Sequence, residues 1–214
     1  MKAGSIFMNN MTAKEAYNFV VNLGLKRHEI SEQIIMKDPM WIYWYAHDII
    51  KGRWPEAEPV IMTEPERAYD YAHNIIKGRW IEAEQYIMKD PVYAYLYAKY
   101  IIKGRWSKAE PTIITDPKLA YNYTKYIIKG RWKAAEQYIM TDPESAYYYA
   151  YDFIEGRWSK AEQYIMKDPE YAYRYARYVL KGRWSKAEPV IAKYPFWWDR
   201  YKKDRKSTRL NSSL

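Results

Sequence analysis

The side chains best suited to chemistry are two histidines and two aspartates: His47, Asp48, Asp70 and His73. The two histidines are 26 residues apart, and two imidazoles with a carboxylate could bind zinc. Nothing in their spacing fixes such a geometry, so the sequence predicts no metal site. The chain contains no Cys, no Gly-rich phosphate loop and no nucleophile motif. We therefore predict no catalytic residue, no cofactor and no enzymatic activity.

These residues sit in a repeat that is organised around the tripeptide Gly-Arg-Trp. The tripeptide occurs six times, always 26 residues apart, starting at Gly52, Gly78, Gly104, Gly130, Gly156 and Gly182. A constant period of this length indicates a repeat architecture. We number each unit from its first residue, an Asp in five units and Glu64 in the other, as position 1.

Each unit carries the start and stop signals of two helices. Asp at position 1 followed by Pro at position 2 favours a helix start. We expect this first helix to reach position 14 and to end with the Gly at position 15 as a left-handed cap. A shorter second helix is expected from the capping boxes Ser107–Glu110, Ser159–Glu162 and Ser185–Glu188. No strand pattern is present, and the sequence predicts an all-α fold, a right-handed α-solenoid of helix-turn-helix repeats.

The constant residues of the unit are expected to form the scaffold. Positions 5, 6, 8, 9, 12 and 13 share one face of the first helix and are mostly Ala, Tyr and Ile, which indicates a packing face. In the third unit the structural residues are Gly104, Arg105, Trp106 and Glu110. We expect the Trp to wedge between units, and the Arg and Glu to form a repeated ion pair.

The array is expected to be one solenoid over residues 12–203. Residues 1–11 are a leader, residues 12–37 a degenerate capping repeat, residues 38–193 the six repeats and residues 194–203 a cut repeat or a cap. In the capping repeat, Thr12 and Glu15 are expected to form a capping box. The last eleven residues, 204–214, resemble a translated sequencing adapter, which matches ten of them from Asp204 to Ser213. We expect that tail to be foreign to the fold.

Three positions of the first helix change from unit to unit while the frame around them stays constant. Positions 7, 10 and 11 lie on the face opposite the packing face, and we call them the variable face. Positions 7 and 10 supply the candidate partner-binding residues, Trp44, His47, Asp70, His73, Leu96, Lys99, Asn122, Lys125, Tyr148, Tyr151, Arg174 and Arg177. Position 11 contributes Asp48, Asn74, Tyr100, Tyr126, Asp152 and Tyr178.

Two functions are compatible with this face. The first is a non-enzymatic scaffold that binds a protein or peptide, because stacked repeats align equivalent positions into one extended surface. The alternative is binding of single-stranded RNA or DNA, because the face combines cations with tyrosines. Asp48, Asp70 and Asp152 interrupt its positive charge. Solvated drift of unconstrained positions is a third possibility.

Net charge and hydropathy limit the kinds of partner and the cellular location that the sequence allows. The net charge of +9 falls to about +7 without the tail, which weakens the argument for an acidic partner. No apolar run approaches the ~18–20 residues that a membrane helix needs, and the N-terminus is a poor signal peptide. We expect a cytoplasmic protein without a membrane partner.

The pattern Asp-Pro…Ala-Tyr-x-Tyr-Ala…Ile-Lys-Gly-Arg-Trp…Ala-Glu resembles a short helical repeat found in proteins of tailed phages and environmental viral sequences. The resemblance covers residues 38–193 and implies residence in a host cytoplasm, but it implies no activity and no functional residue. The unit is similar in architecture to tetratricopeptide-type and Sel1-type repeats, although 26 residues is shorter than either.

Overall fold

A computed structural model describes the backbone of residues 10–211 and the side chains of residues 10–205. Every regular element among these residues is a helix, and the helices recur with the 26-residue period, so the predicted all-α helical repeat array is confirmed. The chain divides into two compact units, unit 1 (Met1–Ile113) and unit 2 (Ile114–Leu214). Most of the leader, residues 1–9, lies outside the described residues.

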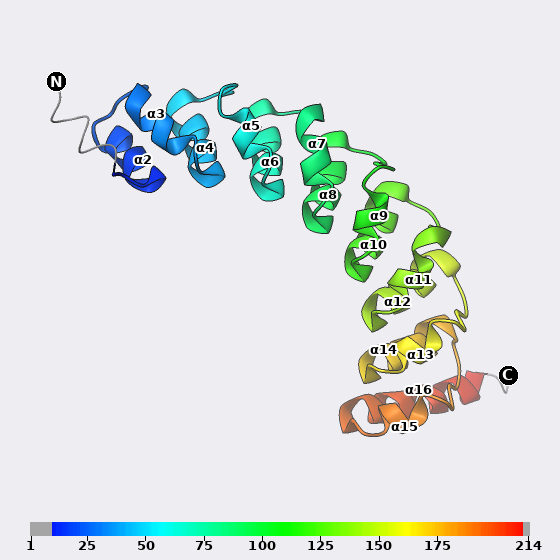
Figure 1. Cartoon of the computed structure of the whole chain (residues 1–214). Helices are drawn as coiled ribbons and strands as arrows, with labels where there is room; N and C mark the ends of the chain where they lie inside the picture. The colour runs from blue at the N-terminus through cyan, green and yellow to red at the C-terminus, as the bar shows by residue number, and fades with distance from the viewer. Residues whose placement is uncertain (1–9, 212–214) are drawn as a thin grey trace. The chain divides into compact units, whose positions relative to one another are not determined.

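Unit 1 holds the degenerate repeat and three regular ones. Its α-helices are α2 (Ala13–Asn22), α3 (Glu29–Ile35), α4 (Pro39–Tyr45), α5 (Glu58–Ile61), α6 (Pro65–Tyr71), α7 (Ile81–Ile87), α8 (Pro91–Tyr97) and α9 (Glu110–Ile113). The first helix of each repeat, which we call the A helix, packs beside the A helix of the next repeat, as α4, α6 and α8 do in Figure 1. The second or B helices, α3, α5, α7 and α9, form the other layer.

Unit 2 repeats the same arrangement. Its α-helices are α10 (Pro117–Tyr123), α11 (Glu136–Ile139), α12 (Pro143–Tyr149), α13 (Glu162–Ile165), α14 (Pro169–Arg174), α15 (Glu188–Ile191) and α16 (Pro195–Asn211), and a 3-10 turn, η5 (Lys133–Ala135), precedes α11. The A helices α10, α12, α14 and α16 pack in sequence, each against the next.

The A helices begin as the sequence predicts. The carboxylates of Asp38, Asp90, Asp116, Asp142 and Asp168 accept hydrogen bonds from free backbone N–H groups of the first turn, and Pro follows each. The capping box of Thr12 and Glu15 is also formed. Glu64 makes no such bond, since its side chain is one methylene longer, and α6 starts without a side-chain cap.

In the six regular repeats the second half of the A helix is a π-helix, which the sequence does not predict. These turns are η1 (Ala46–Ile50), η2 (Ala72–Ile76), η3 (Ala98–Ile102), η4 (Thr124–Ile128), η6 (Ala150–Ile154) and η7 (Tyr175–Val179). Their hydrogen bonds span five residues, as from the Lys129 N–H to the Thr124 carbonyl at 2.8 Å. The wider turn rotates less per residue than an α-helix, so positions 10 and 11 are displaced from the face that position 7 occupies.

The residue that ends each A helix in the left-handed region is not the glycine. Positive φ angles of 51–58° belong to position 14, at Lys51, Lys77, Lys103, Lys129, Glu155 and Lys181. The assignment of Gly104 as a left-handed cap is therefore wrong, and its neighbour Lys103 has that role at φ 56°. The N–H of Gly104 closes the helix end by donating to the Ala98 carbonyl at 3.2 Å.

Substitutions at these two neighbouring positions are expected to raise the stability of the fold or leave it unchanged. Lys103→Gly should stabilise the fold by roughly 0.5–1 kcal/mol, because a left-handed conformation is costly for a residue with a Cβ. Gly104→Ala should be neutral or slightly stabilising, since its Cβ would meet nothing within 4 Å. Urea unfolding measures both, and a loss of stability in Gly104→Ala would return the cap role to the glycine.

Most B helices are only four residues long, and two of the predicted capping boxes are not formed. Helices α13 and α15 begin at Glu162 and Glu188, after Ala161 and Ala187, and neither has a side-chain cap. The boxes Ser159–Glu162 and Ser185–Glu188 are wrong because both glutamates bind the arginine five residues earlier. Glu110 is bound in the same way by Arg105, with Nε to Oε1 at 2.6 Å. These glutamate carboxylates take part in the contact between repeats and not in a helix cap.

The core is a row of aromatic stacks. In each repeat the Trp at position 17 packs on the Tyr at position 8 with ring centroids 5.0–5.2 Å apart. The six tryptophans are only 2–6% exposed, and these tyrosines are completely buried. Trp106, expected to wedge between repeats, is thus buried, as are the Ala and Ile residues at positions 20 and 24.

Within each unit, a hydrogen-bonded cluster, the inter-repeat clasp, ties one repeat to the next. It joins the Arg, Trp and Glu at positions 16, 17 and 21 to the Tyr at position 8 of the following repeat. The Tyr71 hydroxyl accepts from the Trp54 N–H at 2.6 Å and donates to Glu58 at 3.1 Å. Arg53 holds Glu58 with two bonds of 2.7 and 2.8 Å. The expected Arg–Glu pair is therefore present, and it orients the carboxylate that binds the buried tyrosine.

The last A helix, α16 (Pro195–Asn211), is longer than the others. It continues through residues 204–211 of the adapter-like tail, where no Lys-Gly-Arg-Trp sequence is present to end it. Tyr201 completes a clasp by accepting from the Trp184 N–H at 2.8 Å. Asp204 takes position 11 and accepts from Tyr173 at 2.7 Å. Residues 212–214 of the tail lie outside the described residues.

Candidate interaction surface

The variable face separates into an exposed part and a half-buried part. At position 10, all residues except Lys99 are exposed, and at position 11 Tyr100, Tyr126 and Tyr178 are 42–49% exposed. At position 7 only Trp44 is exposed, at 37%. Asp70, Leu96, Asn122, Tyr148 and Arg174 are half-buried. Positions 10 and 11 are therefore the surface that a partner can reach.

Position 7 contributes to the packing between neighbouring A helices. The Tyr148 ring lies 5.9 Å from the Tyr121 ring of the preceding repeat and 6.3 Å from the Tyr171 ring of the following one. Arg174 forms an ion pair of 2.6 Å with Glu170 on its own helix. The role of these side chains is partly structural, so they are poor positions for testing binding alone.

The tyrosine at position 6, expected only in the packing face, reaches this surface with its hydroxyl. The tyrosine ring is nearly buried in most repeats, and the position 10 side chain of the same repeat lies over it. His47 and His73 stack on Tyr43 and Tyr69 with centroids 5.8 and 5.6 Å apart. The hydroxyls of Tyr43, Tyr121 and Tyr173 bond the position 11 side chain of the next repeat. The sequence analysis missed this contact of the hydroxyl because it assigned the whole tyrosine side chain to the packing face.

Some of the resulting contacts are charged triads. Lys125 donates to the Tyr121 hydroxyl at 2.9 Å and to Asp152 at 3.0 Å, and the Tyr121 hydroxyl donates to Asp152 at 2.7 Å. Burial and the bond to Asp152 raise the pKa of Tyr121 to about 12. Arg177, Tyr173 and Asp204 form the same triad, with the Arg–Asp pair at 2.9 Å. These triads join position 10 of one repeat to position 11 of the next, 27 residues later.

Other pairs at the same two positions are uncharged. Tyr151 packs over Tyr147 with ring centroids 6.3 Å apart, and Tyr178 takes position 11 in the next repeat. In unit 1 the His73 ring meets the Tyr100 ring edge-on at 6.4 Å. Lys125 with Asp152 and His73 with Tyr100 are therefore complementary pairs, whereas the corresponding pairs His47 with Asn74 and Lys99 with Tyr126 combine other residue types. The complementary pairs argue against random drift at those contacts.

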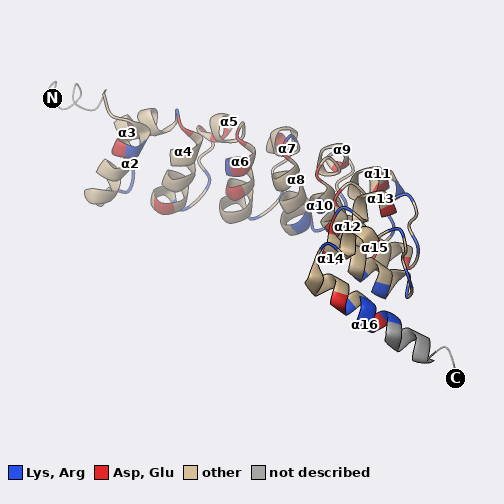
Figure 2. Cartoon of the chain, turned by 90° about the horizontal axis from the view of Figure 1, so that it is seen from below, with Lys and Arg blue, Asp and Glu red and all other residues tan. Residues whose placement is uncertain are grey.

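The cations of the variable face are engaged within the protein. Lys125, Arg174 and Arg177 each form an ion pair. Lys99 lies over the Tyr95 and Tyr100 rings at 5.4 and 5.1 Å. Acidic and basic residues are mixed along the A helices (Figure 2). A phosphate backbone would have to compete with these internal partners, which weakens the nucleic-acid alternative.

The two histidines and their carboxylates are not assembled as a metal site. His47 bonds Asp48 at 2.6 Å and His73 bonds Asn74 at 2.9 Å, each within its own helix. Asp70 pairs instead with Arg67 at 3.0 Å, and burial raises its pKa. Within residues 10–211 no group of three or more His, Asp or Glu side chains is arranged to hold a metal ion.

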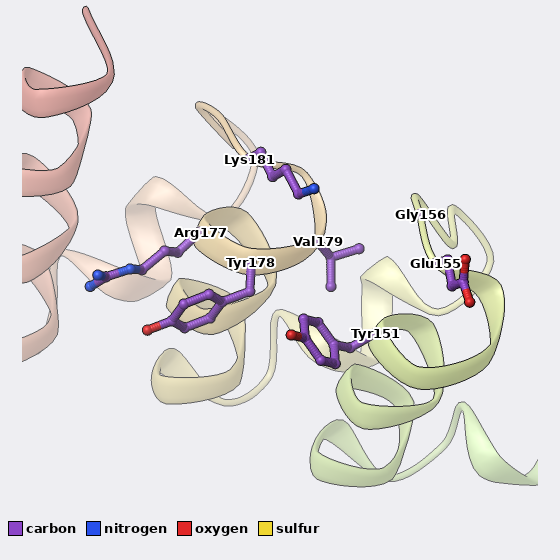
Figure 3. A pocket seen from close by; sticks show the side chains of 7 residues that line it. All are labelled: Tyr151, Glu155, Gly156, Arg177, Tyr178, Val179 and Lys181. Carbon is purple, nitrogen blue, oxygen red and sulfur yellow. The ribbon is translucent and has the colours of Figure 1, made fainter. Parts of the chain in front are cut away.

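Two open hollows lie between A helices of unit 2. One, of about 330 Å³, is lined by Lys118, Tyr121, Asn122, Lys125, Glu144, Ser145 and Tyr148. The other, of about 500 Å³, is lined by Tyr151, Glu155, Gly156, Arg177, Tyr178, Val179 and Lys181. Figure 3 shows Tyr151 and Val179 facing each other across the second hollow, while Arg177 extends away from it. The structure thus brings predicted residues of adjacent repeats together in two places.

The part of the chain that the structure describes has no helix long and apolar enough to cross a membrane. No family model, curated protein or solved structure matches the chain. Function therefore has to be argued from the variable face.

Proposed function

We propose that this chain is a non-enzymatic repeat scaffold that binds a protein or peptide through positions 10 and 11 of its A helices. The observation that carries this proposal is the set of exposed rings on the A helices of each unit, Tyr100 in unit 1 and Tyr126, Tyr151 and Tyr178 in unit 2, at 42–52% exposure, with Trp44 at position 7 exposed as well. Aromatic side chains lose little conformational entropy when they are covered, and they are enriched at protein interfaces.

The charge distribution supports a protein partner over a nucleic acid. The cations beside these rings are occupied by neighbouring carboxylates or rings. Such a surface would gain little binding energy from phosphate groups. It offers a protein partner apolar contact area that is surrounded by polar groups. The constant clasp residues hold the A helices in place and leave positions 10 and 11 free to vary.

Selection from a random peptide library tests the proposal. Peptides selected on the wild-type chain should bind at least about tenfold less tightly to a triple variant Tyr100→Ala, Tyr151→Ala, Tyr178→Ala, since each ring is an anchor of the expected contact. The control is Ile81→Ala, which removes a side chain that is 70% exposed on the B helix α7.

Circular dichroism should show the same helical signal and melting in all three proteins, since the substituted rings are exposed. Peptides that bind the triple variant as well as the wild type would contradict the proposal. Binding of single-stranded RNA at low salt, lost by the triple variant, would favour the nucleic-acid alternative.

A further inference from the structure

The loops that join the A helix to the B helix of each repeat, the AB loops, carry lysines without ionic partners in unit 2. These loops are residues 129–135, 155–161 and 181–187. They contain five exposed lysines that form no ion pair with any described residue, namely Lys129, Lys133, Lys160, Lys181 and Lys186. Glu155 is the only acidic residue of the three loops. Because the A helices that precede the loops pack against one another, the lysines lie along one edge of the unit.

The arginine in each of these loops is already occupied. Arg131, Arg157 and Arg183 each form an ion pair of 2.6–2.8 Å with the glutamate at position 21. On the variable face of the same unit, Lys125 is paired with Asp152 at 3.0 Å. An ammonium group without a carboxylate partner loses only water and counterions when it meets a phosphate. The lysines of the AB loops are therefore better placed to bind an anion than the cations of the variable face.

The charge of the AB loops is not dictated by the fold. At position 19 the first two regular repeats have Glu56 and Glu82, whereas the last two have Lys160 and Lys186, and all four side chains are exposed. The Arg–Glu pair of the clasp forms in all four repeats. A lysine at position 14 suits the C-terminal end of a helix and recurs in both units. The lysines at positions 18 and 19 have no such structural reason, so they add positive charge that the scaffold does not need.

These loops offer positive charge without rings or apolar anchors. None of the exposed large apolar side chains of the described residues lies in the three loops. Single-stranded nucleic acids stack their bases on aromatic rings, peptide partners are held by buried side-chain anchors, and stable membrane attachment adds an apolar anchor to a basic patch. A nucleic-acid duplex keeps its bases stacked inside and presents one negative charge for about every 1.7 Å of its axis. Charge complementarity therefore favours a duplex backbone as the ligand of this edge.

We propose that the AB-loop edge of unit 2 binds the phosphate backbone of a nucleic-acid duplex without reading its base sequence. Lys160 and Lys186 make the contacts that distinguish this edge from the first two AB loops of unit 1, and the other three loop lysines add to them. This inference goes beyond the proposed peptide-binding function, because it assigns a second partner to residues outside positions 10 and 11. The two surfaces adjoin at the hollow of about 500 Å³, whose lining includes both Lys181 and Tyr151 (Figure 3).

A titration of the full-length chain with a labelled DNA duplex, followed by fluorescence anisotropy, tests the inference. We expect binding at about 50 mM salt that weakens at least about tenfold at about 200 mM, because each phosphate contact contributes about −0.9 to the slope of log affinity against log salt. Duplexes of different base sequence should bind equally, since side chains that contact only phosphates carry no sequence information.

Matched charge reversals identify the edge. The double variant Lys160→Glu, Lys186→Glu introduces the residue that position 19 has in the first two regular repeats, so it should keep the helical circular dichroism of the wild type. It should lower the affinity for the duplex at least about tenfold at low salt and reduce the salt slope by about 2. The control, Lys167→Glu, Lys193→Glu, makes the same change of net charge with two exposed lysines that follow the B helices α13 and α15. It should weaken binding by less than about threefold, because the effect of distant charges is screened by salt.

The outcomes separate this inference from the proposed function. The triple variant Tyr100→Ala, Tyr151→Ala, Tyr178→Ala should bind the duplex as the wild type does, and Lys160→Glu, Lys186→Glu should retain the library-selected peptides. No binding of the duplex at low salt, or an equal loss in the control, would overturn the inference. Tighter binding of polyglutamate, or of vesicles of phosphatidylcholine and phosphatidylserine, would assign the edge to a different partner and overturn it as well.

Discussion

Trp106→Ala is expected to destabilise the fold by about 3–5 kcal/mol, the usual cost of truncating a buried aromatic side chain. The Trp106 ring is only 5% exposed and packs on Tyr97 with centroids 5.1 Å apart. Since small domains are stable by about 5–15 kcal/mol, the loss is a large fraction of the total. Urea unfolding followed by circular dichroism measures it.

The effect should depend on burial and not on the general loss of an apolar group. Ile81→Ala also truncates an apolar side chain, but Ile81 is 70% exposed on α7. This substitution should change the free energy of unfolding by less than about 0.5 kcal/mol. A melting curve of Trp106→Ala that coincides with the wild type would refute the buried, wedging role of the tryptophan.

The scaffold was largely predictable because its signals are local. Asp followed by Pro starts a helix in any context, and a 26-residue period leaves no choice but a repeat. The π-helical turns were not predictable, since no residue type at positions 9–13 distinguishes a five-residue hydrogen bond from a four-residue one. The left-handed Lys103 was missed for a related reason: glycine is the usual residue there, and Gly104 stands next to it.

The errors at the B helices have a different cause. Ser159 and Glu162 have the spacing of a capping box, but the Glu162 carboxylate is held by Arg157 at 2.7 Å. The capping box does not form because this carboxylate belongs to the inter-repeat clasp, in which the Trp158 N–H donates to the Tyr175 hydroxyl of the next repeat at 2.6 Å. Local rules succeed where no other group competes for the same side chain.

The candidate surface was predicted as a set of positions but not as a set of pairs. Treating positions 7, 10 and 11 as equivalent follows from a uniform α-helix, and the π-turn breaks that equivalence. The pairing of Lys125 with Asp152 could have been found from the sequence alone, because a cation at position 10 is followed 27 residues later by an aspartate at position 11 of the next repeat. Such complementary changes at a fixed distance indicate neighbouring side chains.

The second large effect is expected at alkaline pH, where the array should unfold cooperatively between about pH 10 and 12. Burial is the main cause that raises the pKa of Tyr45, Tyr97, Tyr149 and Tyr175 to about 12, and the neighbouring glutamates raise it further. Tyrosine in an unfolded chain has a pKa of about 10. The folded protein therefore holds more protons in this window, so stability is complete below pH 10 and falls as the pH rises through 12.

The size of the effect follows from the number of tyrosines that share this environment. A displacement of about two pKa units corresponds to roughly 2–3 kcal/mol per group at pH 12. Four such groups together approach or exceed the whole stability of a typical domain of about 5–15 kcal/mol. The buried tyrosines should therefore ionise together with global unfolding and not one at a time.

Two signals recorded on the same sample measure this coupling. Tyrosinate absorbance and the helical circular dichroism should change over the same pH interval. Raising the salt concentration screens the general repulsion between surface charges but leaves the ionisation of buried hydroxyls, so the midpoint should move little. A helical signal that persists at pH 12 while the buried tyrosines ionise would show that the clasp is dispensable. The repeats would then be held by the Trp–Tyr stacks alone, and the constancy of Arg and Glu at positions 16 and 21 would need another explanation.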